Sequence, residues 1–315
     1  MEACIVIAGG AINPAEGEYQ DGVVQAIEVG SRLLTKGKSA LEVVEEVARQ
    51  IEDNPLFNCG TGARLNLKGQ VEMDACIMDG RALRSGAVAS IQNIKNPVLV
   101  ARKVMEETDH CLLVGGGAET FARALGFEKY DPLTEAKREE WRNLIDAMRS
   151  GKELPARYAA VLRNFNKLKD WLDDDTVGVI AMDRQGDLAA ATSSGGGPLK
   201  MPGRVGDVPL IGSGIYADNR AGGAVLTGNG EAIVRHLAGK MARDLMAEDW
   251  SAQETAEKVV AFFNEREPKA VVSILTLDKS GRFGGARNVD TTPHAGWREK
   301  DGGIQSHFAT VMRQA

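Results

Sequence analysis

Hydrophobic positions in the first half of the chain alternate between strand-like and helical patterns. The apolar run Ile5–Ile7 ends at a glycine pair and predicts a buried strand that leads into a turn. Apolar residues at helical spacing predict one helix over about 22–35 and a second that begins after Ser39, where Glu42 completes a capping box. A β-meander, a helix, a short strand and another helix are then predicted, over residues 64–93, 97–105, 111–114 and 117–125.

The second half of the chain shows the same alternation. Val177–Met182 and Leu188–Ala191 lie on either side of a turn and predict a β-hairpin. The glycine-rich stretch Ser193–Gly214 follows it. Beyond this stretch the pattern predicts a strand, two helices and a hairpin, over residues 224–226, 231–246, 252–263 and 271–286. Because strands bracket paired helices in both halves, we expect a layered α/β fold.

A segment of different composition separates the two halves. Between Glu135 and Asp175, 18 of 41 residues are charged, about 44% against 26% for the whole chain. A weak apolar stripe in its first part, including Trp141 and Leu144, indicates an exposed helix. The segment is typical of a linker or a processed tail.

Composition excludes several classes of protein. A net charge of −6 leaves no broad basic surface for nucleic acid or anionic lipid. The chain contains no run of 18 apolar residues, the length that a membrane span requires. The N-terminus has an acidic residue at position 2 and an apolar stretch too short for a signal peptide, so we expect a cytoplasmic protein. The four cysteines form no CxxC pair and the four histidines have no metal-ligand spacing, which argues against zinc.

Two glycine patterns resemble nucleotide-binding motifs but are incomplete. Gly37-Lys38-Ser39 lacks the glycine that a P-loop needs five positions earlier, where Arg32 stands. The glycine run 115–117 lacks the third glycine, three residues further on, that a dinucleotide-binding loop requires. The chain also has no GxSxG elbow. An enzymatic nucleophile would therefore be of another kind.

A threonine stands where the charged segment stops and the predicted strand Val177–Met182 begins. Thr176 taken alone has an ordinary explanation, because threonine is common in strands. Its context adds hydroxyl groups, an Arg/Asp pair and exposed backbone amides, which lie in Ala191–Gly196, Gly203–Asp207 and Thr227–Glu231. This combination favours a reaction centre at Thr176.

Several motifs in a fixed order extend this pattern over nearly the whole chain. They are Asn54–Asn58 with Gly60–Gly62, Glu72–Ala75 with Ile77–Gly80, Ser85–Ala89, Thr176–Val179, Gly203–Asp207 and Thr227–Glu231. With them the chain resembles the plant-type L-asparaginases and isoaspartyl aminopeptidases, which are N-terminal-nucleophile hydrolases made as inactive precursors. Two features are more similar to the related glycosylasparaginases: Asp175 before the threonine, and Tyr216–Asp218.

The resemblance implies an α/β fold of four layers, the αββα sandwich of N-terminal-nucleophile hydrolases. It implies one domain over residues 1–315 that cleaves itself between Asp175 and Thr176, giving a chain 1–175 with a charged linker from about 128 and a chain 176–315. The implied protein is a homodimer of cleaved protomers that hydrolyses L-asparagine, to aspartate and ammonia, and β-aspartyl (isoaspartyl) dipeptides. Glycosylasparaginase activity and an uncleaved, non-enzymatic ligand-binding protein remain alternatives.

The chemistry follows from the weakness of a threonine hydroxyl as a nucleophile at neutral pH, which calls for a base within hydrogen-bond reach. Cleavage before Thr176 would create that base, since a free α-amine has a pKa of about 7.7–8.0. By resemblance, Thr176 attacks the substrate's side-chain amide carbon and forms a β-aspartyl ester that water hydrolyses. The Thr227 hydroxyl and Gly228 amide would form the oxyanion hole. Ser194 would supply a further hydroxyl, while Asn58 would orient the reacting groups or serve as an Asx-turn residue.

Substrate recognition is also implied by the resemblance. Arg204 offers a planar fork to the substrate α-carboxylate, while Asp207 and the Gly230 carbonyl would receive the α-ammonium group. Without the other motifs, Arg204 and Asp207 would be explained as a salt bridge in a glycine-rich turn. No cofactor is implied, but family members bind a structural sodium ion through backbone carbonyls. In this chain these would belong to Ile51, Glu52, Asn54, Phe57, Cys59 and Thr61.

Two positions depart from the family pattern. Ser194 stands where the family usually has threonine, so the hydroxyl is kept but the methyl group and its restriction of χ1 are lost. Ala8 precedes Gly9-Gly10 where the family usually has histidine, which removes a polar anchor from the first loop. We expect the first departure to affect cleavage or turnover and the second to affect packing of the loop.

Overall fold

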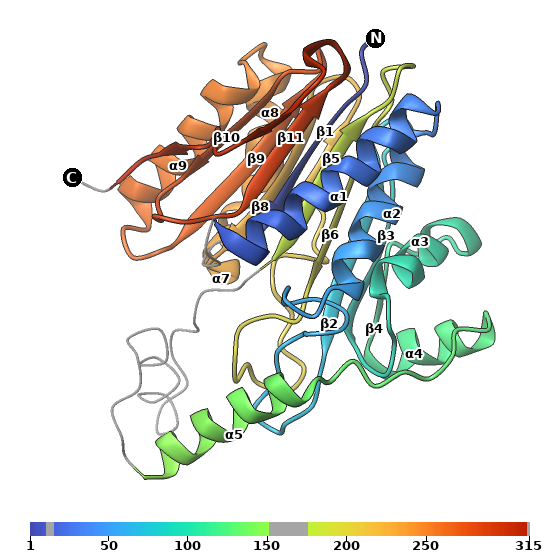
Figure 1. The fold of residues 1–315 in the computed structure, drawn as a ribbon, viewed down its shortest axis with the longest axis vertical. Coiled ribbons are helices and arrows are strands. Elements are labelled where there is room, and N and C mark those ends of the chain that lie inside the picture. Colours follow the sequence, from blue (N-terminus) through green and yellow to red (C-terminus); the bar gives the residue numbers. More distant parts are fainter. Residues whose placement is uncertain (11–15, 151–175, 314–315) are drawn as a thin grey trace.

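The computed structural model describes residues 1–10, 16–150 and 176–313, and these form four layers (Figure 1). An eight-stranded sheet packs face to face against a five-stranded sheet. Helices α1 (Gly17–Thr35), α2 (Ala40–Asp53) and α3 (Pro97–Glu107) cover the outer face of the larger sheet. Helices α8 (Ala238–Ala247) and α9 (Ala252–Arg266) cover the smaller one. The predicted αββα sandwich is confirmed.

The larger sheet combines strands from before and after the charged segment. Its order is β12-β11-β1-β5-β6-β2-β3-β4, with only the β3–β4 pair parallel. The bounds are β1 Cys4–Gly9, β2 Met73–Asp79, β3 Arg84–Ile91, β4 Leu112–Val114, β5 Val177–Met182, β6 Leu188–Ser194, β11 His294–Arg298 and β12 Ile304–Ser306. Because β5 and β6 lie between β1 and β2, a break in the chain before β5 would leave both parts hydrogen-bonded in one sheet.

The smaller sheet is built entirely from the second half of the chain. Its order is β13-β10-β9-β8-β7. The bounds are β7 Ile215–Asp218, β8 Gly222–Gly228, β9 Val272–Asp278, β10 Phe283–Arg287 and β13 Thr310–Val311. Strand β8 faces β5 and β6 of the larger sheet. This packing brings the end of β8 close to the start of β5.

Three apolar cores hold the four layers together. One lies between α1–α3 and the larger sheet, and includes Ile27, Val44 and Ile77. A second lies between the sheets around residues such as Ile180 and Val225, and a third joins the smaller sheet to α8 and α9. Since successive residues of a strand point to opposite faces, a strand inside this stack is apolar on both sides. This explains why the six residues of β5 are all buried.

Local signals predict some helices well and one poorly. The capping box at Ser39 is present: its hydroxyl accepts from the Glu42 amide, and the Glu42 carboxylate accepts from the Ser39 amide. The single helix predicted over 231–246 is wrong, because α7 (Gly230–His236) is followed by Leu237, which has a left-handed φ of 48°. In the first turn of α8 the Gly239 and Lys240 amides donate to the Ser213 and Gly212 carbonyls, so tertiary contacts compensate the break.

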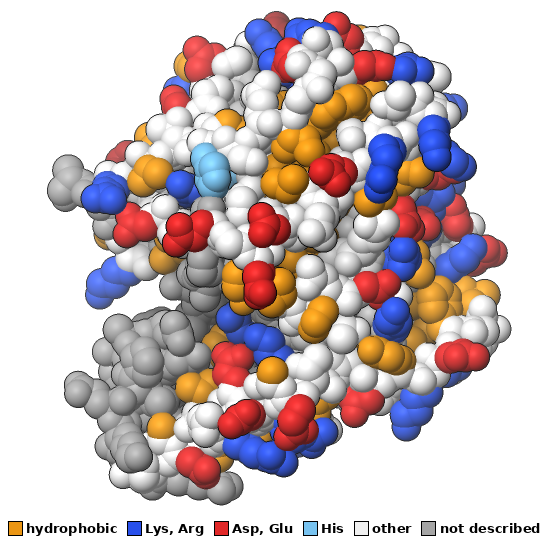
Figure 2. Space-filling model, viewed as in Figure 1, with side chains coloured by type: hydrophobic (Ala, Val, Ile, Leu, Met, Phe, Trp, Pro, Cys, Tyr) orange, Lys and Arg blue, Asp and Glu red, His pale blue; other side chains and the backbone are white. Residues whose placement is uncertain are grey.

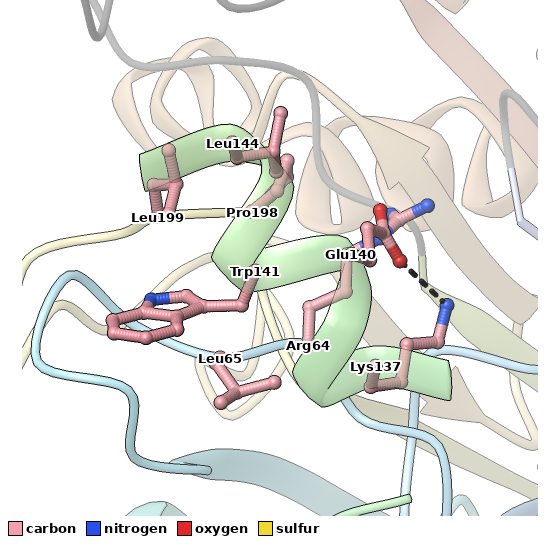
Figure 3. A pocket seen from close by; sticks show the side chains of 8 residues that line it. All are labelled: Arg64, Leu65, Lys137, Glu140, Trp141, Leu144, Pro198 and Leu199. Atoms are coloured by element: carbon pink, nitrogen blue, oxygen red, sulfur yellow. Dashed lines mark hydrogen bonds and ion pairs between the residues drawn. The ribbon is translucent and has the colours of Figure 1, made fainter. Parts of the chain in front are cut away.

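The predicted charged helix is present as α5 (Glu135–Arg149), while the rest of the segment to Asp175 lies outside the described residues. Trp141 donates its indole N–H to the Asn66 carbonyl (2.9 Å). Leu144 packs against the buried Leu199, in the loop that follows β6. A cavity of about 10 Å³, room for about one water molecule, remains between them (Figure 3). Helix α5 is therefore docked beside the glycine-rich stretch.

The short helix α4 (Gly115–Ala124) lies earlier in the chain.

The surface in Figure 2 has acidic and basic side chains interspersed, with no continuous basic region on that face. None of the helices in the described part of the chain is both long and apolar enough to span a membrane. Cys4, Cys59 and Cys76 are buried, and Cys111 is exposed. Burial raises the pKa of the Cys4 and Cys76 thiols to about 12, so these two stay protonated near neutral pH.

Candidate active site

Thr176 immediately precedes β5, in the middle of the larger sheet. The residue is 1% exposed. In the uncut chain its backbone N–H donates to the Thr227 hydroxyl oxygen, with 3.1 Å between nitrogen and oxygen. The Thr176 hydroxyl is buried and has no hydrogen-bond partner among the described residues. Most buried hydroxyls in folded proteins form a hydrogen bond, and those of Thr255 and Ser273 are further exceptions among the described residues.

The register of the larger sheet places Ser194 beside Thr176. Val177 pairs with Ser193 in the antiparallel β5–β6 ladder, so the preceding residue Thr176 lies opposite the following residue Ser194. Directly opposed residues share one face of a sheet. Gly178, two residues after Thr176, lies against Val225 of the smaller sheet, so this face is the one turned toward β8. The Ser194 hydroxyl accepts from the Gly196 amide (2.8 Å).

Thr227 and Gly228 end strand β8 on the opposite side of this interface. Thr227 is buried and supplies the hydroxyl that Thr176 contacts. Gly228 has φ +129°, and a Cβ there would lie 2.1 Å from the Val271 carbonyl oxygen. Only glycine fits this backbone without strain. The packing of the two sheets thus brings Thr176, Ser194 and Thr227 together from three strands.

The start of α7 follows directly. Asn229 caps this helix, its side-chain oxygen accepting from the Ala232 amide (2.9 Å), and Gly230 is its first, buried residue. Glu231 then turns its carboxylate to the guanidinium group of Arg204. Two parallel hydrogen bonds of 2.9 Å join them, from Nε and Nη2. Such a bidentate pair fixes the plane of the guanidinium group.

Arg204 is largely enclosed, with 9% of its side chain exposed against 33% for Glu231. Arg204 thus forms an ion pair with Glu231, a partner outside the glycine-rich turn. The motif Thr227–Glu231 was recognised in the sequence, but no role was predicted for its last residue. Contact between two elements 27 positions apart is not visible in local spacing.

Asp207 is fully buried, three residues after Arg204 in the same glycine-rich stretch. Its backbone carbonyl accepts from the Leu210 and Gly214 amides. A Cβ on Gly214 would come within 2.6 Å of an Asp207 carboxylate oxygen, so glycine makes room for this carboxylate. Arg204 and Asp207 therefore lie on one compact loop.

Asn58 organises the loop that follows Ser194. Its side-chain nitrogen donates to the Gly196 carbonyl (2.8 Å), and its side-chain oxygen accepts from the Arg64 amide (2.8 Å). Its own carbonyl accepts from Gly195. These contacts join the Gly195–Gly196 backbone to the loop that carries Asn58. An Asx turn in this region is formed by Asn54, which accepts from the Leu56 amide.

The loop predicted to hold sodium folds back on itself. The Thr61 amide donates to the Glu52 carbonyl (2.7 Å), and the Phe57 amide donates to the Asn54 carbonyl. A Cβ at Gly60 would lie 2.2 Å from the Glu52 carbonyl oxygen, so the glycine allows the backbone to approach. Among the described residues no group of three or more His, Cys, Asp or Glu could hold a metal ion. The carbonyls of Glu52 and Asn54, two of the predicted sodium ligands, thus accept hydrogen bonds from backbone amides of the same loop.

One buried carboxyl lies beneath this loop. The Glu52 side chain accepts from the Val98 amide at the start of α3 (3.1 Å). Burial raises its pKa to about 8, and the hydrogen bond from Val98 opposes this rise. The carboxyl is therefore largely protonated at pH 7. The sequence contained no signal for this, since the pKa depends on burial.

The second departure from the family pattern, Ala8, lies opposite His294 in the β1–β11 ladder. His294 is buried, and burial lowers its pKa to about 4. Its Nε2 accepts from the Ala309 amide, so Nδ1 carries the proton and donates to the Thr292 carbonyl. A neutral imidazole thus lies next to Ala8 on the neighbouring strand. The loop expected to change, residues 11–15, lies outside the described residues.

Comparison with known proteins gives consistent results. The sequence model of a family described as asparaginase matches residues 1–303. The chain is 42% identical over 296 residues to a plant-type L-asparaginase of Pyrococcus horikoshii, covering 90% of this chain and 92% of the relative. It is 41% identical over 290 residues to an isoaspartyl peptidase of Escherichia coli, covering 89% and 88%. An isoaspartyl peptidase/L-asparaginase of Xenopus laevis is 41% identical over 287 residues, covering 89% and 87%.

Proposed function

The chain belongs to the asparaginase family, and from this premise we propose that it hydrolyses L-asparagine and β-aspartyl dipeptides with Thr176 as an N-terminal nucleophile. One chain of contacts supports the proposal above all others. Thr176 contacts Thr227, and Glu231, four residues after Thr227, holds Arg204. The proposed nucleophile, Thr176, and the proposed group for the substrate α-carboxylate, Arg204, are therefore connected through the five residues Thr227–Glu231.

The proposed reaction needs cleavage between Asp175 and Thr176, which gives chains 1–175 and 176–315. In the uncut chain the nitrogen of Thr176 is an amide and cannot act as a base. The freed amine would take the proton of the Thr176 hydroxyl as its oxygen attacks the substrate's amide carbon. Ammonia, or the amine of the dipeptide's second residue, leaves with that proton. Water, deprotonated by the same amine, then hydrolyses the β-aspartyl ester.

Two groups are proposed to stabilise the oxyanion of the tetrahedral intermediate. The Thr227 hydroxyl lies 3.1 Å from the nitrogen of Thr176, within reach of a carbonyl that Thr176 attacks. The Gly228 amide follows it directly in β8. Asn58 would act at a distance, by holding the Gly195–Gly196 backbone beside Ser194.

Recognition of the amino-acid head is proposed to rest on Arg204, Asp207 and the Gly230 carbonyl. Arg204 is held by Glu231, so its orientation is set before substrate arrives. Asp207 is fully buried on the same loop and would face the α-ammonium group. The arrangement suits substrates with a free α-amino acid end.

Sodium, a cytoplasmic location and a homodimer of cleaved protomers complete the proposal. The carbonyls of residues 51–61 would hold the ion in a structural role, keeping the loop after α2 in place. The thiols of Cys4, Cys76 and Cys111 agree with a reducing compartment. Light scattering coupled to size-exclusion chromatography would test this oligomeric state. The expected molar mass is twice that of one 33.7 kDa chain.

A substrate panel tests the proposed function. Purified, fully cleaved protein should release ammonia from L-asparagine and free amino acids from β-aspartyl dipeptides. Activity confined to a glycosylated asparagine would instead support glycosylasparaginase. An uncleaved protein that binds aspartate and turns over none of these substrates would support the non-enzymatic alternative.

We expect Arg204→Lys to lower kcat/KM for asparagine about tenfold or more, equivalent to about 1.4 kcal/mol. Lysine keeps the charge but loses both the fork for the substrate carboxylate and the parallel bonds to Glu231. Cleavage should continue, because the precursor bond presents no free α-carboxylate. An unchanged kcat/KM in fully cleaved Arg204→Lys protein would exclude Arg204 from the site.

We expect Ser194→Thr to speed precursor cleavage or turnover about two- to fivefold, the rate equivalent of ordering one side-chain rotor. A β-branched side chain holds its hydroxyl in fewer χ1 wells than serine does. Ser194→Ala should slow both processes strongly, because it removes the hydroxyl beside Thr176. A gel time course of cleavage, with asparagine hydrolysis measured on cut protein, checks both variants. If Ser194→Ala matches the parent protein in both assays, the residue has no part in the reaction.

A further inference from the structure

The proposed recognition loop, Gly203–Asp207, has no helix or strand of its own. Its backbone N–H groups must therefore find partners elsewhere. Two of them donate to carboxylates at β2, a strand of the larger sheet, one from the residue just before the strand and one from its second residue. The carboxylates belong to Glu72 and Asp74, in a motif to which the proposed reaction assigns no role.

Glu72 holds the beginning of the loop. Both of its carboxylate oxygens accept from the Gly203 amide, at 3.0 and 3.2 Å. Its backbone carbonyl accepts from the ammonium group of Lys200 (2.9 Å), a lysine that is 2% exposed. One residue thus receives hydrogen bonds from two points on the segment that leads into Arg204.

Asp74 holds the other end of the loop. One carboxylate oxygen accepts from the Gly206 amide (3.3 Å) and the other from the Ser90 amide in β3 (2.7 Å). In the β2–β6 ladder Asp74 lies opposite Ser194, which lies opposite Thr176 in turn. Asp74 therefore links the strand beside the nucleophile to the recognition loop.

The two bonded amides flank Arg204. A glycine-rich loop has many accessible backbone conformations, and holding it at both ends reduces the freedom of the residues between. Charged acceptors form stronger hydrogen bonds to N–H groups than neutral ones do. Buried carboxylates are therefore well suited to fixing a loop that must present a guanidinium group at a set distance from a nucleophile.

We propose that Glu72 and Asp74 are positioning residues for substrate binding, which fix the backbone of Gly203 and Gly206 and so aim Arg204 and Asp207 at the amino-acid head of the substrate. This inference rests on the proposed function of the same site. It places specificity for a free α-carboxylate and α-ammonium group partly in β2. Neither carboxylate touches the substrate.

The two carboxylates predict different responses to amide substitution. In Asp74→Asn a single oxygen must serve two N–H groups, and the shorter bond to Ser90 should retain it, which leaves Gly206 without a partner. In Glu72→Gln the remaining oxygen still serves the one amide of Gly203. We expect KM for asparagine to rise about tenfold in Asp74→Asn and in Glu72→Ala, with kcat within about threefold, and to stay within about threefold in Glu72→Gln.

The experiment measures KM, kcat, extent of cleavage and melting temperature for all three variants and for Asp183→Asn. Asp183 is a matched control: it is a buried aspartate that accepts from the Gln185 and Asp187 amides in a turn outside the site. Its variant should lose stability without any change in KM. Cleavage in the β2 variants should match that of the parent protein, because cleavage does not use the recognition loop.

Several results would overturn the proposal. If Asp74→Asn and Glu72→Ala raise KM no more than Asp183→Asn does, or if Glu72→Gln is as impaired as Glu72→Ala, the carboxylates do not position the loop. If the variants at both Glu72 and Asp74 fail to fold or to cleave, these two carboxylates are requirements of the fold alone. A parent protein that is itself inactive on asparagine and β-aspartyl dipeptides would remove the proposed function, and this inference with it.

Discussion

Replacing Thr176 with alanine is expected to leave one full-length chain with no measurable hydrolysis of asparagine. The alanine variant has no hydroxyl to attack either the Asp175–Thr176 bond or a substrate. The fold should persist, because β5 begins at the next residue and its pairing to β1 and β6 involves backbone groups. A denaturing gel and an ammonia-release assay measure both consequences.

Thr176→Ser is the matched control, since it keeps a hydroxyl and a cleavable amide at the same position. It should be cut and active, although more slowly than the parent protein, because serine is less restricted about χ1. Cleavage of Thr176→Ala at this bond would show that Thr176 is not the nucleophile. The mechanism proposed above would then fail.

Replacing Thr227 with alanine is expected to lower kcat by about 10²–10³, the typical effect of losing one oxyanion-hole donor. The Thr227 hydroxyl is the group that contacts the nitrogen of Thr176, at 3.1 Å. Its loss also removes the acceptor of the hydrogen bond from that nitrogen, so precursor cleavage should slow as well. Kinetics on fully cut material separate the two effects, and Thr227→Ser should recover most of the activity.

A matched control for this variant is available in the same sheet. Thr276 in β9 is buried and donates its hydroxyl to the Ala252 carbonyl (2.8 Å), away from the proposed site. Thr276→Ala should cost about 1 kcal/mol of stability and leave kcat unchanged. Equal activity of Thr227→Ala and Thr276→Ala would remove Thr227 from the oxyanion hole.

Much of the fold could be predicted because its signals are local. The capping box at Ser39 and the apolar run of β5 need only neighbouring residues to be recognised. Strand β7 and the strands after residue 290, β11, β12 and β13, were missed. These strands have two to five residues, and short strands carry too few alternating positions to be distinguished from loops. Strand β11 also pairs with β1, at the other end of the chain, so this pairing has no local signal.

The candidate site likewise combines features that the sequence predicts with features that depend on the folded structure. Thr176, Arg204 and Thr227 could be nominated because they stand in motifs with a fixed order. The alignment of Thr176 with Ser194 depends on strand register, and the pairing of Arg204 with Glu231 depends on the packing of α7 against the loop. Both are long-range properties. The role we infer for Glu72 and Asp74 depends equally on contacts more than 130 positions apart in the chain.

The central claim is that Thr176 becomes a chain terminus that carries both nucleophile and base. Intact-mass spectrometry of the purified protein, with sequencing of any new N-terminus, tests it most directly. Two chains that correspond to residues 1–175 and 176–315, the second beginning Thr-Val-Gly-Val, are the predicted result. A single 33.7 kDa chain in a preparation that hydrolyses asparagine, or a second chain that begins at any other residue, would contradict the account.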